Sequence, residues 1–178
     1  MNTVKKIETF TSQLANHFTP FFDVYRDKNI DGIPLSFLAI FKRRDERYMI
    51  TKKIKVYGVE NQQLVFTTIC DERLDLSFFK KLQRAMEKTL LEYIPSHEEH
   101  MSTIILGIVV VDQDVDSKVL KEVRRFRKLR FLKFGLHGWV EMYWVLINLR
   151  DRSITIHPKG RPFIASVEKI LKEDGSWR

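Results

Sequence analysis

The sequence has little of what stabilises secreted proteins or anchors proteins in a membrane. Its single cysteine, Cys70, cannot form an internal disulfide. The longest apolar run, residues 104–111, is far shorter than the ~20 residues that a membrane-spanning helix requires. The first residues, MNTVKKIETF, lack the apolar core of a secretory signal. These absences predict a cytoplasmic protein in a reducing environment, without a transmembrane segment.

Familiar catalytic motifs are absent as well. The sequence has no glycine-rich nucleotide loop, no nucleophile elbow and no zinc-finger spacing. Cys70 is followed by Asp71 and Glu72, whose negative charges disfavour a thiolate, so a nucleophilic cysteine is not expected. No cofactor is predicted. The chain also lacks internal repeats, linkers and low-complexity tracts.

The sequence does contain enough apolar material for a folded core. Of its 178 residues, 44% are apolar and 12% are aromatic, which argues against disorder. A chain of this length suits one compact unit, so we expect residues 1–178 to form a single domain.

Hydrophobic periodicity predicts about four helices and five or six strands. Apolar residues recur at helical spacing in residues 3–18 and 76–94, and Asp75 or Ser77 can cap the second of these helices. Two further helices are predicted to begin near residues 117, where Ser117 can provide the cap, and 162. The predicted strands are residues 33–41, 48–56, 63–69, 103–111, 139–149 and 153–157, with a short extended piece at 21–25.

The connections between these strands indicate the fold class. Tight turns at residues 43–46, 60–62 and 150–152 would join consecutive strands as antiparallel pairs. Residues 103–111 are apolar and largely β-branched, which is typical of a central strand that is buried on both faces. We therefore predict an α+β fold with a mostly antiparallel sheet of about five or six strands and about four helices packed on it.

The most informative feature is a concentration of positive charge. Residues 118–133, KVLKEVRRFRKLRFLK, contain eight Lys or Arg and one acid, so they carry seven of the chain's eight net positive charges. This local excess predicts either an anionic partner or a local set of counter-charges. The predicted anion-binding residues are Lys121, Arg124, Arg125, Lys128, Arg130 and Lys133.

More than one partner fits this segment. Phe126, Phe131 and Phe134 are interleaved with the cations, so their rings could stack on nucleic-acid bases while the cations contact phosphates. The same aromatic residues also recur at core spacing, and a charged helix face is often only solvated. Contact with an anionic membrane surface is the less favoured interpretation, because amphipathic helices of this kind usually face a protein core.

A second candidate site contains His97 and His100. Two imidazoles three positions apart can bind one metal ion if the loop is helical there, and Asp71 or Asp112 could supply further ligands. This spacing does not match the zinc-protease motif, in which the histidines are four positions apart. The alternative interpretation is that His97 and His100 are exposed loop residues that bind no metal.

Two further patterns have weaker functional interpretations. Asp112, Asp114 and Asp116 have the spacing of calcium-loop ligands, but Ser117 stands where the loop needs glycine, which excludes an EF-hand. We expect these acids to end a strand and to lie at the N-terminus of the next helix. The sequence HPKGR, residues 157–161, could bind a phosphate through its amides and cations, although a plain turn explains it too.

Two longer stretches carry a resemblance to a known family. They are HEEHMSTIILGIVVVD, residues 97–112, and FLKFGLHGW, residues 131–139, followed by a strand and a KGR turn. The chain resembles a family of small uncharacterised bacterial proteins, known only as hypothetical proteins. The resemblance covers most of the chain and implies no activity, substrate or catalytic residue.

Three functional hypotheses follow from these observations. The first is a cytoplasmic, non-enzymatic binding or regulatory domain whose basic surface binds nucleic acid or an acidic protein. The alternative is a metal-assisted hydrolase or nuclease that uses His97, His100 and nearby acidic residues. The third is a homo-oligomeric scaffold in which the cations pair with acids across a subunit interface.

Overall fold

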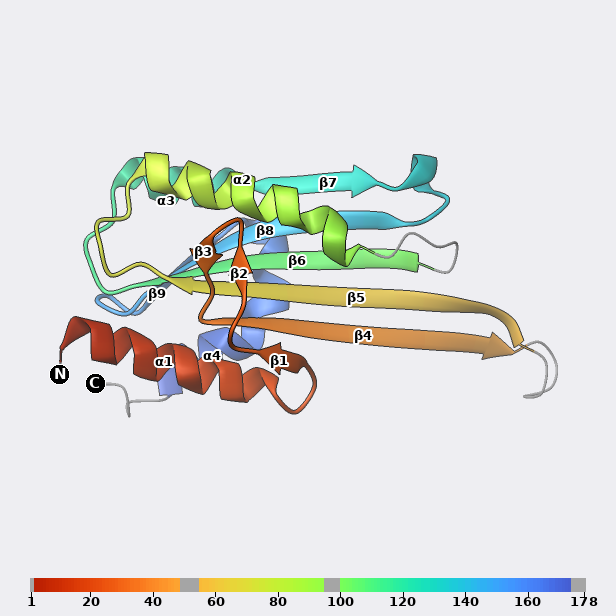
Figure 1. The fold of residues 1–178 in the computed structure, drawn as a ribbon, viewed down its shortest axis with the longest axis horizontal. Coiled ribbons are helices and arrows are strands. Elements are labelled where there is room, and N and C mark those ends of the chain that lie inside the picture. The colour runs from red at the N-terminus through yellow and green to blue at the C-terminus, as the bar shows by residue number, and fades with distance from the viewer. Residues whose placement is uncertain (1, 49–54, 95–99, 174–178) are drawn as a thin grey trace.

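The computed structural model describes residues 2–48, 55–94 and 100–173. Within these ranges the chain forms four α-helices, nine strands and two short 3₁₀ helices (Figure 1). In chain order they are α1 (Thr3–Phe18), β1 (Asp23–Tyr25), β2 (Asn29–Ile30), β3 (Ile33–Pro34), β4 (Phe37–Tyr48), β5 (Lys55–Ile69), α2 (Leu76–Tyr93), β6 (His100–Val111), α3 (Ser117–Arg125), β7 (Arg127–Phe131), η1 (Lys133–Gly135), β8 (Trp139–Asn148), β9 (Ser153–Ile156), η2 (Pro158–Ile164) and α4 (Ala165–Glu173).

The main sheet is mixed, which corrects part of the predicted fold class. Its strands follow the order β1-β4-β5-β6-β8-β7, and β9 also pairs with β8. The α+β class is confirmed, but β6 runs parallel to both β5 and β8. The reason is the crossover: α2 returns the chain to the end of the sheet at which β5 began, so β6 must run in the same direction as β5. The remaining pairs are antiparallel.

Two of the predicted turns are wrong. Residues 43–46 and 60–62 lie inside β4 and β5, which pair continuously from Phe37 opposite Thr67 to Arg47 opposite Tyr57. Charged and amide residues indicated turns in the sequence, yet backbone ladder hydrogen bonds form between strands whatever their side chains. The predicted meander of three strands is therefore one long β4–β5 hairpin. Part of the predicted strand 48–56 lies outside the described residues.

The helix predictions agree closely with the structure, except that the last helix, α4, begins at Ala165 and not near residue 162, because Pro162 lies inside η2. α1 spans the predicted residues, and α2 ends one residue earlier than predicted. The Asp75 carboxylate caps α2 by accepting a hydrogen bond from Phe78 N at 2.8 Å. The cap of α3 is Asp116 and not Ser117 as predicted, because the Asp116 carboxylate accepts from Lys118 N at 2.8 Å. This places an acid at the positive end of the helix dipole.

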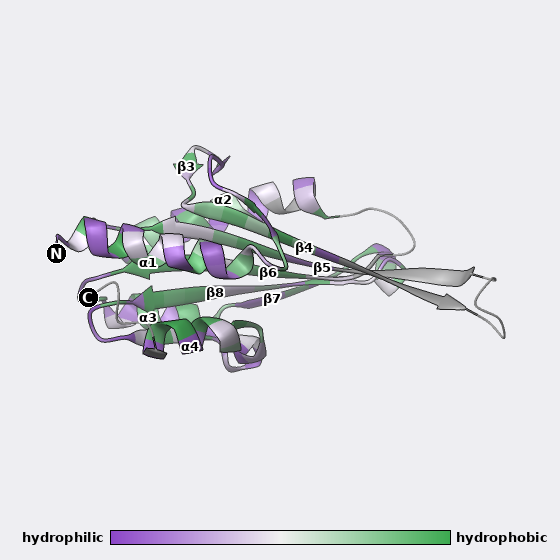
Figure 2. Ribbon diagram, turned by 90° about the horizontal axis from the view of Figure 1, so that it is seen from below, coloured by the Kyte–Doolittle hydropathy of each residue, from purple (hydrophilic) through white to green (hydrophobic). Residues whose placement is uncertain are grey.

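Helices cover both faces of the sheet. Side chains of α2, α3 and the small β2–β3 hairpin pack on one face, together with Leu64, Ile105 and Trp144. Side chains of α1 and α4 pack on the other face, together with Leu106 and Val145. Figure 2 shows α2 on one side of the sheet and α4 on the other. Strand β6 contributes alternate residues to both cores, as predicted for residues 103–111.

A single glycine in β6 makes room for the largest side chain of the core. Gly107 lies directly opposite Trp144 of β8. A Cβ atom at Gly107 would lie 2.7 Å from Trp144 Cζ3 and 2.8 Å from Met86 Sδ. Trp144 in turn makes an edge contact with Phe79 of α2, with the ring centroids 5.3 Å apart. The absence of a side chain at residue 107 therefore fixes how α2 packs on the sheet.

We predict that Gly107→Ala lowers the free energy of unfolding by about 1–3 kcal/mol, because the added methyl group overpacks this site. Urea denaturation followed by circular dichroism measures the loss.

The double variant Gly107→Ala/Trp144→Phe supplies the control. A smaller ring at residue 144 leaves space for the methyl group, so the two losses should sum to more than the loss of the double variant. Strictly additive losses would contradict the proposed contact.

Candidate functional site

The basic segment folds as a helix followed by a strand at the edge of the sheet. α3 ends at Arg125, and the chain then enters β7, which pairs with β8 in antiparallel register (Figure 1). Strand β7 was not predicted from the sequence. Leu129 and Phe131 alternate with Lys128 and Arg130, but this alternation is short, directly follows the helical pattern of the basic segment and buries neither face, since all five β7 residues are exposed.

The predicted anion-binding residues lie along this edge, and we call them the basic ridge. Lys121, Arg124 and Arg125 are exposed on α3, whose Val119 and Val123 face the core. Lys128 and Arg130 are on β7, opposite Met142 and Val140, so they project on the α2 side of the sheet. Lys133 is in the turn after β7.

Acidic neighbours neutralise little of the basic ridge. Within the described part of the chain, Lys128 is the one ridge residue in an ion pair, with its Nζ 2.8 Å from Glu87 Oε2 of α2. Glu122, the acid inside the basic segment, pairs with Lys80 of α2. The five other ridge residues have no carboxylate partner among the described residues: Lys121, Arg124, Arg125, Arg130 and Lys133.

Arg127 belongs to a separate interaction that joins β7 to β8. Its Nε donates to Glu141 Oε1 at 2.6 Å and lies 3.3 Å from the Tyr143 hydroxyl, which also donates to Glu141. Partial burial opposes the charge on Glu141, but the hydrogen bonds from Tyr143 and Arg127 outweigh it and leave the pKa of Glu141 lowered. Burial and the Glu141 carboxylate raise the pKa of Tyr143. Sequence reasoning missed Glu141 and Tyr143, because their proximity to Arg127 depends on the register of a strand that was not predicted.

Apolar side chains are exposed beside the basic ridge. Leu129 and Phe131 of β7 are 40% and 62% exposed, and Leu136 in the following turn is 80% exposed. Phe134 in the same turn is fully exposed. Leu129 and Phe131 lie opposite Glu141 and Trp139, so they project on the α1/α4 side of the sheet. The edge is therefore cationic on one side and apolar on the other.

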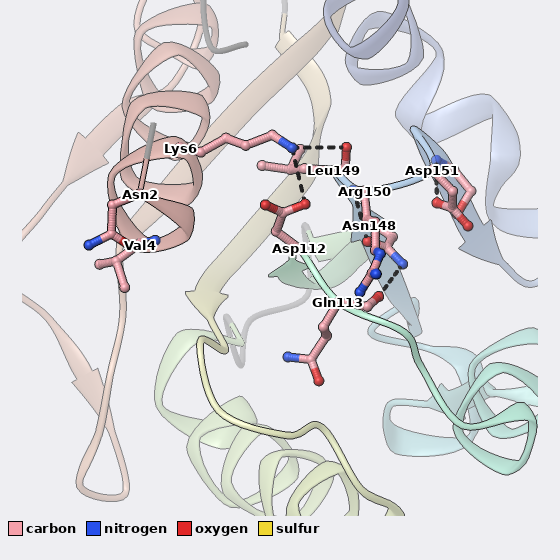
Figure 3. A network of polar contacts seen from close by, with 10 residues as sticks. Asn2, Val4, Lys6, Asp112, Gln113, Asn148, Leu149, Arg150 and Asp151 are labelled. Carbon is pink, nitrogen blue, oxygen red and sulfur yellow. Dashed lines mark hydrogen bonds and ion pairs between the residues drawn. The ribbon is translucent and has the colours of Figure 1, made fainter.

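The acids that follow β6 bind three different structural partners. Asp112 Oδ1 lies 3.1 Å from Lys6 Nζ of α1 (Figure 3). Asp114 Oδ2 lies 3.4 Å from Arg150 Nη1. Asp116 caps α3. The predicted role of these residues at a strand end and a helix start is confirmed.

At the same end of the sheet, the side chain of Gln113 links the segment after β6 to the segment after β5. It donates to the carbonyls of Cys70 and Glu72 and accepts from Leu74 N at 3.0 Å. Asn148 Nδ2 donates to the Gln113 carbonyl at 2.7 Å (Figure 3). The carboxyl ends of parallel strands are a common location for ligand sites. In this protein, the polar groups of Gln113 and Asn148 at this end hydrogen-bond to other groups of the chain.

The HPKGR segment forms an ordered turn that packs on β8. Its Lys159 N donates to His157 Nδ1 at 3.1 Å, and Gly160 N donates to the His157 carbonyl at 2.9 Å. The Arg161 side chain pairs with Glu168 of α4. A Cβ atom at Gly160 would lie 2.9 Å from the Tyr143 ring, so glycine is required for this contact. Two of the amides that could bind phosphate are thus used within the turn.

The proposed metal ligands lie outside the described side chains. This holds for His97 and for the side chain of His100, although its backbone begins β6. Among the described residues, no three His, Cys, Asp or Glu side chains are grouped as a metal site. Asp71 is exposed and Asp112 pairs with Lys6. Trp144 is a core residue, as predicted, whereas Trp177 lies outside the described residues.

Cys70 has the unreactive environment that its sequence neighbours predicted. The residue is buried, and its Sγ lies 3.1 Å from the Glu72 carbonyl. Burial and the charges of Asp71 and Glu72 raise the pKa of Cys70 to about 11. Very little thiolate therefore forms near neutral pH.

We predict that Glu141→Gln lowers the pKa of Tyr143, because the substitution removes a charge that opposes formation of the tyrosinate. Ultraviolet titration of tyrosinate measures this shift, and Tyr143→Phe identifies the contribution of Tyr143. The stability that Glu141 provides is present above the ordinary glutamate pKa and is lost as the pH falls through its lowered folded value. Glu141→Gln should remove that dependence on acid.

Glu168→Gln is the matched control, because Glu168 also pairs with an arginine but lies on α4. It should leave the Tyr143 titration unchanged. An unchanged Tyr143 pKa in Glu141→Gln would show that the carboxylate is not bonded to the hydroxyl in solution.

Comparison with known proteins gives a family but no activity. No curated protein and no solved structure matches the chain. No helix in the described ranges is both long and apolar enough to span a membrane. Residues 6–169 match a domain of unknown function, DUF8052, which agrees with the resemblance to uncharacterised proteins. Because the match covers most of its length, the chain belongs to the DUF8052 family.

Proposed function

We propose that this protein is a cytoplasmic, non-enzymatic binding or regulatory protein whose basic ridge binds an anionic macromolecule. The observation that carries the proposal is the exposure of five ridge cations without a carboxylate partner among the described residues. Surface cations in proteins are commonly dispersed and solvated individually. Here seven of the eight net positive charges fall within sixteen consecutive residues.

The fold supports this proposal by concentrating the charge along one line. α3 and β7 are consecutive, so their cations lie beside one another along the sheet edge and not around the whole molecule. The nearby acids Glu122 and Glu141 are each engaged by a cation outside the ridge, Lys80 and Arg127. The ridge therefore keeps a positive potential that attracts anions over about a Debye length.

We predict that Arg124→Glu/Arg125→Glu weakens binding to an anionic probe about tenfold, since each exposed charge pair contributes about 0.2–1 kcal/mol and reversal adds repulsion. Fluorescence anisotropy with labelled polyglutamate and with single-stranded oligothymidine measures the affinity. Binding should weaken steeply between about 50 mM and about 200 mM salt.

Lys169→Glu/Lys172→Glu is the control, with the same change in net charge on exposed residues of α4. It should affect affinity much less than reversal on the ridge. Equal losses in the two variants would mean that only net charge matters, and absence of binding to both probes at about 50 mM salt would refute the proposal.

A further inference from the structure

Strand β7 is an open edge of the sheet. It pairs with β8 on one side, and no described strand lies on its other side (Figure 1). An open edge presents unpaired backbone N–H and C=O groups, to which another strand can add. All five β7 side chains are exposed, so no described element covers this edge.

The register identifies which backbone groups are available. Leu132 N donates to the Gly138 carbonyl at 2.9 Å. Leu132 and Gly138 are therefore a hydrogen-bonded pair just beyond β7, and the backbone groups of Leu132 face the β8 side. Hydrogen-bonded and non-hydrogen-bonded pairs alternate in an antiparallel ladder. The backbone groups of Lys128 and Arg130 therefore face β8, and those of Arg127, Leu129 and Phe131 face outward.

The turn after β7 exposes two further apolar side chains. Lys133, Phe134 and Gly135 all have positive φ angles, of 43°, 56° and 90°. Such a backbone is unfavourable for a bulky residue such as Phe134. The turn is nevertheless held by hydrogen bonds, among them Gly135 N to the Leu132 carbonyl at 2.9 Å. It exposes Phe134 and Leu136, which follow Phe131 closely in the sequence.

A second copy of this chain is a poor occupant of the edge. The outward backbone groups are on residues 127, 129 and 131, so antiparallel self-pairing must place these opposite one another. In each register that pairs Leu129 with Arg127, Leu129 or Phe131 of the second copy, Lys128 or Arg130 lies opposite a cation of that copy. Like charges directly opposite each other destabilise a sheet.

We infer that β7 binds an extended segment of an acidic protein, which adds to the sheet as a further strand and in which acidic and apolar residues alternate. This inference rests on the proposed function and specifies its partner. Acidic side chains of the added strand would lie beside Lys128 and Arg130, and apolar side chains would lie beside Leu129 and Phe131. Both sides of the edge would then be complemented by one strand, as in known cases of β-augmentation.

The probe for the test is a short labelled peptide in which glutamate and valine alternate. A peptide of the same composition, with the glutamates in one block and the valines in another, is its control. The intact protein should bind the alternating peptide at least about tenfold more tightly than the block peptide, because only alternation places charge and apolar surface on opposite sides of a strand.

Leu129→Pro tests the backbone contact directly. Proline removes an outward N–H group without breaking a hydrogen bond to β8, and edge strands tolerate proline at such positions. We expect about a tenfold or greater loss of affinity with an unchanged circular dichroism spectrum. Leu129→Ala keeps the N–H group and should lose less, which separates the backbone contact from the side chain.

Hydrogen exchange gives a readout that does not depend on substitution. On addition of the alternating peptide, the amides of Leu129 and Phe131 should become protected, whereas those of Lys128 and Arg130 should be protected already.

The outcomes separate this inference from the proposed function. Equal binding of the two peptides, unchanged affinity in Leu129→Pro, or binding only to oligothymidine or to phosphatidylserine vesicles would overturn strand addition and leave an anion-binding ridge. Absence of binding to every anionic probe would overturn both.

Discussion

The pairing of β7 with β8 determines which way each side chain of β7 points. Arg127, Glu141 and Tyr143 hold the start of this pairing, with Arg127 Nε 2.6 Å from Glu141 Oε1. Once Arg127 projects to the α1/α4 side, alternation places Lys128 and Arg130 on the α2 side and Leu129 and Phe131 with Arg127. A slip of one residue would exchange the cationic and apolar sides. The candidate surface thus depends on one register.

The acids near the basic ridge explain why its charge persists. Three of them are engaged by groups outside the ridge: Glu122 pairs with Lys80, Glu141 bonds Arg127 and Tyr143, and Asp116 caps α3. Glu87 is the exception, since it pairs with Lys128 at the surface. A surface ion pair of this kind contributes little stability and can exchange for a better partner. Arg124 and Arg125 also lie in the last turn of α3, where the helix dipole favours positive charge.

The parts of the fold that could be predicted are those with a repeating physical signal. The apolar spacing of α1 and α2 and the cap at Asp75 lie where the sequence indicates them, and so does the doubly buried β6. The parallel pairing of β6 could not be predicted, because it depends on how α2 crosses the sheet. Strand β7 was not predicted either, because its alternation of cationic and apolar residues is short and directly follows the helical pattern of α3. The six basic residues could be proposed from charge alone, whereas the separation of Lys128 and Arg130 from Leu129 and Phe131 onto two sides of the edge required the register.

The central claim is that the ridge arginines are free for an external anion while Arg127 is already bonded. Solvent exchange of the arginine Nε–H protons, measured by NMR on the protein without a partner, tests this most directly. We expect slow exchange for Arg127 and fast exchange for Arg124, Arg125 and Arg130. Slow exchange at all four would contradict it, because the guanidinium groups of the ridge would then be bonded within the protein itself.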